Sequence, residues 1–370
     1  MTPRILVTTG EPSGDLHGGR VVQALRRAYP TATIDAVGGP QISRAGARII
    51  HPLDGLGAMG FVEPLLRLPG HWKLYRQLRR AFLAGQYDLL ITIDYPGFHL
   101  RVAEAAKAAG VPVLHYIAPQ LWAWHPARAS RWSRAVDRLA VILPFEPEFF
   151  KARGIESSYV GHPLVDQEPP LGRAAAREAL GVPVAAKVLA LFPGSRRSEI
   201  GRLWQPYRDA ARQLLAAGSA DVVVVAGTAW GKYPDSDGML VVRDRPSTVL
   251  AAADAVLAKS GTTTLEAAIA DVPMVVAYRV HPITYRLARR LVTVPWVSLV
   301  NLIANRAVVP EVVQHAVSTE DLVRRVGPLL DPASPETIAQ RSGFREVREI
   351  LGGPGASERV AALAAELLVR

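Results

Sequence analysis

Short aliphatic runs alternate along the chain with segments whose apolar residues recur at helical spacing. Strands that alternate with amphipathic helices are typical of parallel sheets, so the pattern predicts an α/β protein. The predicted strands are Ile5–Val7, Leu89–Ile93, Val111–His115, Leu139–Leu143, Val188–Phe192, Val222–Ala226 and Met274–Ala277. The clearest predicted helix face consists of Tyr207, Ala210, Ala211, Leu214 and Leu215.

The predicted strands form two groups, separated by the Pro- and Gly-containing stretch YVGHPLVDQEPPLGR. A chain of 370 residues also exceeds what one hydrophobic core usually organises. We therefore predict two Rossmann-like domains that face a central cleft. The predicted domains are residues 1–165 and 166–345, and residues 346–370 form a helical segment that packs across the domains or on a partner chain.

Composition limits the cellular setting and the partners. The chain has no cysteine, which excludes disulfides and thiolate metal sites. Its first apolar run is too short for a signal peptide, and no window of 18 apolar residues follows, so a cytoplasmic protein is expected. The net charge of +10 favours an anionic partner: nucleic acid, a phosphorylated metabolite or a membrane surface. The sequence lacks a nucleic-acid recognition motif, so nucleic acid is not predicted.

The first predicted strand runs into the turn TTGEPSGD, which precedes a helical pattern. Gly10 and Gly14 permit a ligand to approach the backbone closely, and open parallel sheets bind ligands beyond the carboxyl ends of their strands. The glycine spacing fits neither a dinucleotide fingerprint nor a phosphate loop, which argues against a nicotinamide or ATP. Alternatively, Ser13 or Asp15 caps the following helix.

Asp94 directly follows a strongly apolar strand in LLITIDYPGFH, and Pro96 and Gly97 end that strand. A carboxylate at this point lies in the predicted cleft, where a general base must come within hydrogen-bond distance of a substrate proton. The alternative is an aspartate that caps its own loop.

Two turns in the second half of the chain are candidate anion sites. LALFPGSRRSEI places Ser195 and Arg196 near a helix N-terminus, where N–H groups and a guanidinium favour a phosphate, although a solvated arginine is the alternative. In LAKSGTTTLEAAI, hydroxyl and N–H groups can hold phosphate, and a carboxylate one turn later can accept two ribose hydroxyls or close a capping box. The residues of this second turn are Ser260, Gly261, Thr262, Thr263 and Glu266.

Residues 64–87 contain several arginines and no acidic residue. Leu74, Leu78 and Phe82 recur at helical spacing, and this apolar face either packs on its own domain or meets a membrane surface. Pro64 and Pro69 bracket a predicted apolar loop. The residues expected at an anionic membrane are Leu65, Leu66, Leu68, Trp72, Lys73, Arg76, Arg79 and Arg80.

These motifs resemble those of the lipid-A-disaccharide synthases, glycosyltransferases of the GT-B type. The resemblance covers nearly the whole chain and departs at Gly97, where some members have a second aspartate three residues after the position of Asp94. The matching stretches are GEPSGD, GxMGFVE at residues 57–63, IDYPGF, HYIAPQLWAW, LPFEPEFF, VGHPLVD, FPGSR, SGTTTLE, YR at residues 278–279 and VSLVNLIANR.

The resemblance implies transfer of diacylglucosamine from UDP-2,3-diacylglucosamine to 2,3-diacylglucosamine 1-phosphate, which gives a β-1,6-linked disaccharide 1-phosphate and UDP with inversion at the anomeric carbon. It implies an N-terminal domain that binds the acceptor and faces the membrane, and a second domain that binds the UDP-sugar. No cofactor and no metal are implied. The expected location is the inner face of the cytoplasmic membrane, and a homodimer stays open.

On this basis Asp94 is the predicted base, Glu11 its alternative, and Arg196 the cation for the departing diphosphate. Another UDP-sugar enzyme, such as an epimerase or hydrolase, and a non-catalytic nucleotide-binding scaffold at the membrane remain alternatives. The predicted substrate-binding residues are Ser13, Gly14, Met59, Ser195, Ser260, Gly261, Thr262, Thr263, Glu266, Tyr278, Arg279 and Asn301.

Overall fold

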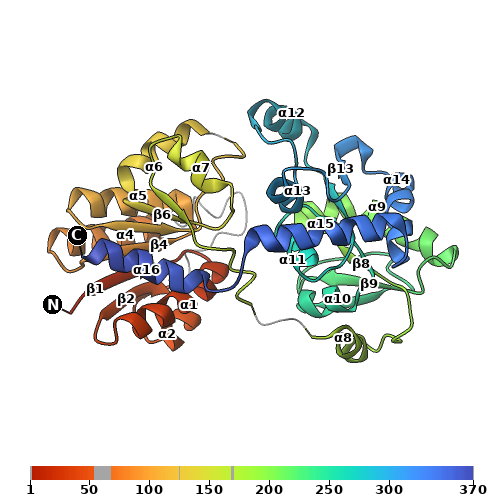
Figure 1. The fold of residues 1–370 in the computed structure, drawn as a ribbon, viewed down its shortest axis with the longest axis horizontal. Coiled ribbons are helices and arrows are strands. Elements are labelled where there is room, and N and C mark those ends of the chain that lie inside the picture. The colour runs from red at the N-terminus through yellow and green to blue at the C-terminus, as the bar shows by residue number, and fades with distance from the viewer. Residues whose placement is uncertain (1, 54–67, 125, 168–170, 370) are drawn as a thin grey trace. The chain divides into compact units, whose positions relative to one another are not determined.

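The computed structural model describes residues 2–53, 68–124, 126–167 and 171–369, and for Leu68 and residues 287–291 the backbone alone. The chain forms two units, Met1–Asp166 with Gly353–Arg370, and Gln167–Gly352 (Figure 1). The boundary expected between residues 345 and 346 falls inside α15 (Pro335–Leu351), because the units divide only after that helix has ended.

The first unit is built on a parallel sheet whose chain order reverses between its first and fourth strands. In open α/β sheets such a reversal opens a crevice beyond the carboxyl ends of the strands, where ligands bind. In spatial order the strands are β3 (Arg48–Pro52), β2 (Thr33–Gly38), β1 (Arg4–Thr8), β4 (Leu89–Ile93), β5 (Val113–Tyr116), β6 (Arg138–Val141) and β7 (Ser157–Tyr159).

Helices cover both faces of this sheet. Alternate residues of β1 serve the two cores, with Leu6 on one face and Ile5 and Val7 on the other. The core around Leu6 is covered by α4 (Leu68–Leu83), α5 (Pro96–Ala108), α6 (Ala129–Ala135) and α7 (Glu146–Lys151), and a short 3-10 helix, η1 (Pro126–Arg128), precedes α6. The other core is covered by α1 (Pro12–Ala28), α2 (Pro40–Arg44) and α16 (Ala356–Leu368).

The last helix, α16, packs beside α1 and buries Val360 and Leu367 in the same core (Figure 1). The backbone N–H groups of Gly355 and Ala356 donate to the carboxylate of Asp166 at 2.7 and 3.0 Å. Asp166, the last residue before the chain enters the second unit, therefore holds the first turn of α16, the helix with which the chain returns to the first unit. We expected residues 346–370 to pack across the domains or on a partner chain. Residues 346–352 belong to the second unit, and α16 packs on the first unit's own sheet.

The second unit repeats the same strand order, with the reversal between β8 and β11. In spatial order its strands are β10 (Leu240–Arg243), β9 (Val222–Gly227), β8 (Val188–Phe192), β11 (Ala255–Lys259), β12 (Met274–Tyr278) and β13 (Glu311–Val313). Its helical segments are α8 (Arg173–Leu180), α9 (Arg197–Ala216), α10 (Pro246–Ala252), α11 (Thr262–Ile269), α12 (Pro282–Leu291), α13 (Leu299–Ala304), η2 (Gln314–Ala316), α14 (Thr319–Val326), η3 (Gly327–Leu330) and α15.

Every strand predicted from an aliphatic run is present, and the predicted helix face of α9 is confirmed, with Tyr207, Ala210, Ala211 and Leu214 buried. None of the helices within the described ranges is both long enough and apolar enough to cross a membrane.

Candidate substrate sites at the carboxyl edges of the sheets

The turn after β1 is shaped by its contact with the turn after β4. A Cβ atom on Gly10 would lie 2.2 Å from Cγ of Tyr95, so only glycine lets the two turns meet. Gly14, expected to contact substrate, is buried and packs on Thr9, which makes it a support of the turn. Glu11 and Ser13 are the exposed polar residues at this edge.

Asp15 caps a different helix from the one it belongs to. Its carboxylate accepts hydrogen bonds from the N–H groups of Gly39, Gln41 and Ile42 at 2.8, 2.9 and 3.2 Å, and so holds the first turn of α2. No side chain caps α1, whose N-cap residue is Glu11. The alternative in which Ser13 or Asp15 caps the following helix is therefore wrong.

Asp94 and Tyr95 stand where β4 ends, beside the β1 turn. Both have left-handed backbone conformations, with φ of 50° and 51°, which is unfavourable for residues other than glycine and is often found at functional sites. Burial raises the pKa of Asp94, and a hydrogen bond from the Tyr95 backbone opposes this in smaller measure. A carboxyl group with a raised pKa at a sheet's switch point is suited to general-base chemistry.

α4 reaches this turn through a residue that the sequence did not mark as functional. The Nε2 atom of His71 lies 3.0 Å from the hydroxyl of Tyr95, and the two rings stack with centroids 6.1 Å apart. Tyr95 also contacts Phe98 and His99 on α5. The backbone that positions Asp94 is thus packed between α4 and α5.

Glu146 holds the turns after β5 and β6. Its buried carboxylate accepts hydrogen bonds from the N–H groups of Ile142 and Leu143 at 3.1 and 2.9 Å, and from the indole of Trp122 at 2.9 Å. Burial raises the pKa of Glu146 from 4.5 to about 7, although these hydrogen bonds act against the rise. Its role in the first unit is structural.

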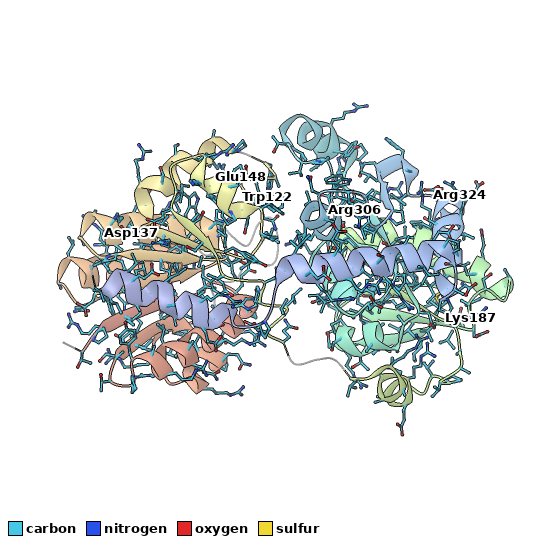
Figure 2. The ribbon with its side chains drawn as sticks, viewed as in Figure 1. Trp122, Asp137, Glu148, Lys187, Arg306 and Arg324 are labelled. Carbon is cyan, nitrogen blue, oxygen red and sulfur yellow. The ribbon has the colours of Figure 1, made fainter. Side chains whose placement is uncertain are left out.

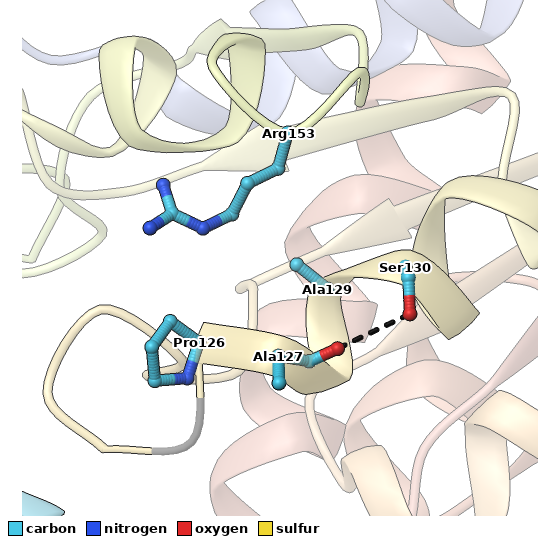
Figure 3. A pocket seen from close by; sticks show the side chains of 5 residues that line it. All are labelled: Pro126, Ala127, Ala129, Ser130 and Arg153. Carbon is cyan, nitrogen blue, oxygen red and sulfur yellow. Dashed lines mark hydrogen bonds between the residues drawn. The ribbon is translucent and has the colours of Figure 1, made fainter.

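Among the residues of the first unit that the structure describes, hollows occur at two places that do not include Asp94. A hollow of about 470 Å³ lies between η1, α6 and Arg153, and none of its lining residues is a predicted site residue (Figure 3). A hollow of about 840 Å³ runs along α4, and Trp72, Lys73, Arg76 and Arg80 line it. The second hollow is therefore lined in part by residues that were predicted to meet a membrane.

The apolar stripe of α4 is core, as Leu74, Leu78 and Phe82 are all buried, so the alternative that it packs on its own domain is confirmed. α4 begins at Leu68, so Pro69 lies in its first turn and not in a loop. Trp72 is 57% exposed and stacks on Tyr75. Lys73, Arg76, Arg79 and Arg80 are exposed, and no ion pair links them to an acidic side chain that the structure describes. Leu65, Leu66 and Met59 lie outside the described residues, as does the side chain of Leu68.

In the second unit, Glu199 occupies the N–H groups that we expected to bind an anion. Its Oε2 atom accepts hydrogen bonds from the backbone of Ser195 and Arg196 at 3.0 and 3.2 Å. Gly194, with φ of 117°, wraps this turn around the carboxylate. The guanidinium of Arg196 remains 79% exposed and lies 3.5 Å from Oε1 of Glu199. The backbone N–H groups of Ser195 and Arg196 are therefore already used, and only the side chains at the start of α9 remain to bind an anion.

Three neighbouring turns meet at Glu199. The ammonium of Lys259, at the end of β11, lies 3.1 Å from its Oε1 atom. Burial tends to raise the pKa of Glu199, but Lys259 and the N–H groups of the turn outweigh burial and lower it. Burial and the charge of Glu199 raise the pKa of Tyr278, which ends β12. Arg279, the next residue, is exposed.

The turn before α11 is exposed at Thr262 and buried at Ser260, whose hydroxyl donates to the carbonyl of Val297 at 2.5 Å. Gly261 is the N-cap residue and no side chain caps the helix, so the alternative capping box of Thr263 and Glu266 is wrong. Burial raises the pKa of Glu266.

Asn301, predicted to bind substrate, is instead buried and fully used by the fold. Its amide donates to the Val309 carbonyl at 3.0 Å and to Glu311 at 2.9 Å, and its oxygen accepts from the N–H groups of Val308 and Val309. Glu311 also accepts hydrogen bonds from the backbone N–H groups at positions 297 and 298. This network fixes the segment that meets Ser260. Among the described residues, no three His, Cys, Asp or Glu side chains cluster so as to hold a metal ion.

Two parallel sheets of this order, each with polar turns at its switch point, define the GT-B fold of nucleotide-sugar enzymes. Solved structures share it: quercetin-bound UGT89C1 of Arabidopsis thaliana (TM-score 0.64, 16% identity, 100% of both chains) and UDP-GlcNAc 2-epimerase of Neisseria meningitidis bound to UDP-GlcNAc (TM-score 0.61, 12% identity, 99% of both chains). At such identity the likeness shows the fold alone.

The family described as lipid-A-disaccharide synthetase matches residues 5–349, and this chain belongs to it. Lipid-A-disaccharide synthase of Geobacter metallireducens is 39% identical, over 99% of this chain and 97% of its own. That of Anaeromyxobacter dehalogenans is 41% identical, over 98% and 96%. The protein is a hexosyltransferase, and the epimerase, hydrolase and scaffold alternatives are not favoured.

The raised pKa of Glu146 predicts a pH effect on stability. Between pH 4.5 and about 7 the folded protein retains a proton that the unfolded chain has released, so this group's contribution to the free energy of unfolding falls as pH rises through that window. Urea unfolding from pH 4.5 to 8 should show that Glu146→Gln lacks this part of the fall. The exposed Glu148, replaced by Gln, is the control and should follow the wild type. If the free energy of unfolding changed with pH in the same way in the wild type and in Glu146→Gln, the raised pKa of Glu146 would be contradicted.

Proposed function

We propose that the β1 and β4 turns of the first unit bind the acceptor, diacylglucosamine 1-phosphate, and that the β8, β11 and β12 turns of the second bind UDP-diacylglucosamine. The observation on which this rests is Asp94, a carboxyl group with a raised pKa on a strained turn at the switch point of the first sheet. Family membership supplies the reaction, and the product is the β-1,6-linked disaccharide 1-phosphate with UDP.

In this proposal Asp94 takes the proton of the acceptor 6-hydroxyl while the oxygen of that hydroxyl attacks the anomeric carbon of the donor. The bond from that carbon to the diphosphate breaks, UDP leaves with the electron pair, and the configuration inverts. Burial raises the pKa of Asp94, which makes its carboxylate a stronger base. In the proposal the exposed Ser13 contacts the acceptor, and Glu11, which lies near it at this edge, is the alternative base.

Arg196 and the turn before α11 bind the diphosphate, and Glu266 binds the ribose. The exposed guanidinium of Arg196 offers charge-assisted hydrogen bonds to phosphate. Gly261, Thr262 and Thr263 begin α11, where N–H groups and hydroxyls favour an anion. Ser195, Tyr278 and Arg279 complete the proposed nucleotide side.

Replacing Asp94 by Asn should lower turnover by roughly 10²–10⁴-fold, because the amide cannot take the proton while the turn keeps its shape. Mass spectrometry of the disaccharide would measure the rate, and circular dichroism would verify the fold. Glu148→Gln, which neutralises an exposed carboxyl of the same unit, should keep turnover within about twofold of wild type. Near wild-type turnover of Asp94→Asn would transfer the role of base to Glu11.

We infer that α4 holds the protein to an anionic membrane surface, from which both acylated substrates are drawn. Trp72 and the half-buried Tyr75 offer an aromatic pair suited to the headgroup region, and Lys73, Arg76, Arg79 and Arg80 surround it. Each basic side chain near anionic lipid contributes about 1 kcal/mol, so these four suffice for reversible adsorption. The buried stripe of α4 takes no part, since the core already uses it.

The protein should sediment with anionic phospholipid vesicles, not with neutral ones, and less at high salt. Arg76→Gln/Arg80→Gln should weaken the binding by about tenfold or more, since two charges are removed from the proposed contact. The control, Arg44→Gln/Lys151→Gln, removes two exposed charges from other helices of the same unit and should bind as the wild type does. Equal losses in both variants would show a dependence on net charge alone and would contradict a role for α4.

A further inference from the structure

Lys259 is a cation at the proposed nucleotide site that the sequence motifs did not single out. It is the last residue of β11, which pairs with β8 so that Ala258 lies beside Phe192. Its side chain is 24% exposed and extends to Glu199 on the neighbouring turn. Lys259 is therefore more shielded from water than Arg196, whose side chain is 79% exposed.

The ammonium of Lys259 has hydrogen-bonding capacity to spare. An ammonium donates three hydrogen bonds, and Glu199 accepts one. No other hydrogen bond or ion pair of this group joins it to a residue in the described part of the chain. The nitrogen lies 3.5 Å from the position that a Cβ atom on Gly261 would take, so it stands directly over the turn that begins α11.

Lys259 changes the charge balance around Glu199 in favour of an anion. The carboxylate of Glu199 alone would repel a phosphate at the start of α9. Lys259 offsets that charge, and Arg196 then leaves the group of three with a net charge of about +1. A partly desolvated cation interacts with phosphate more strongly than an exposed one, because water screens it less.

We propose that Lys259 is a further substrate-binding residue, whose ammonium is oriented by Glu199 and donates to the diphosphate of the UDP-sugar. The inference rests on the proposed nucleotide site. Negative charge grows on the diphosphate as its bond to the anomeric carbon breaks, and a fixed ammonium stabilises that charge. Lys259 thus acts on both binding and the chemical step, and Glu199 is a positioning residue.

The test compares inhibition of the transferase by UDP and by uridine, which lacks the phosphates. Lys259→Met should raise the inhibition constant of UDP by about tenfold or more, as expected for the loss of a charge-assisted hydrogen bond, and leave that of uridine within about twofold. Lys259→Arg should restore most of the UDP affinity. The control, Lys187→Met, removes the same charge from the residue before β8, at the opposite edge of the sheet (Figure 2). This variant should have the inhibition constants of the wild type for both UDP and uridine.

An equal rise for UDP and uridine would show that Lys259 merely braces the two turns, and no rise for either would show that it does not meet the diphosphate; both results overturn the inference. Arg196→Ala separates this failure from failure of the nucleotide site. If Arg196→Ala weakens inhibition by UDP and Lys259→Met does not, only the inference on Lys259 is wrong. If neither variant weakens inhibition by UDP, the diphosphate binds elsewhere and the proposed nucleotide site is wrong as well.

Discussion

Buried and half-buried carboxylates hold the turns at the strand ends, and the geometry of both candidate sites depends on them. A turn at a strand's end presents backbone N–H groups that no neighbouring strand accepts, and burial makes an unpaired N–H costly. At the carboxyl edges Asp15, Glu146 and Glu199 accept these hydrogen bonds in pairs or triplets. Glu311, the first residue of β13, does the same for the segment before α13. Each turn is consequently fixed before any ligand arrives, which lowers the entropy lost on binding.

The same device serves the opposite edges, where Asp88, Asp137, Asp221 and Asp254 each accept the N–H at or just before the start of a strand. Most acidic residues near the strand ends are thus structural. Asp94 differs, because the hydrogen bond that affects its pKa comes from the backbone of the adjacent Tyr95 and not from the N–H groups of another turn. Identifying which carboxylates bind turns therefore narrows the search for those that take part in the chemistry.

Much of this arrangement follows from the sequence, and the remainder depends on contacts between distant residues. Aliphatic runs predict the central strands because burial on both faces demands continuous apolar sequence. Asp94 is predicted as well, since it ends such a run. The strands β3, β7, β10 and β13 were missed because they are short and only partly buried. The strands β2 and β11 are largely buried but were not among the predicted strands either. The roles of Asp15, Asn301 and Glu311 require partners that the chain order does not reveal, and the stripe on α4 could not be assigned to core or membrane by periodicity alone.

The central claim is a single displacement in which one base, Asp94, activates the acceptor. The configuration of the new glycosidic bond tests it most directly, and NMR of the purified disaccharide would determine that configuration from the coupling constant at the anomeric proton. Inversion of the UDP-linked sugar predicts a β linkage with no trace of the α anomer. An α-linked disaccharide, or free diacylglucosamine released without transfer, would contradict the account.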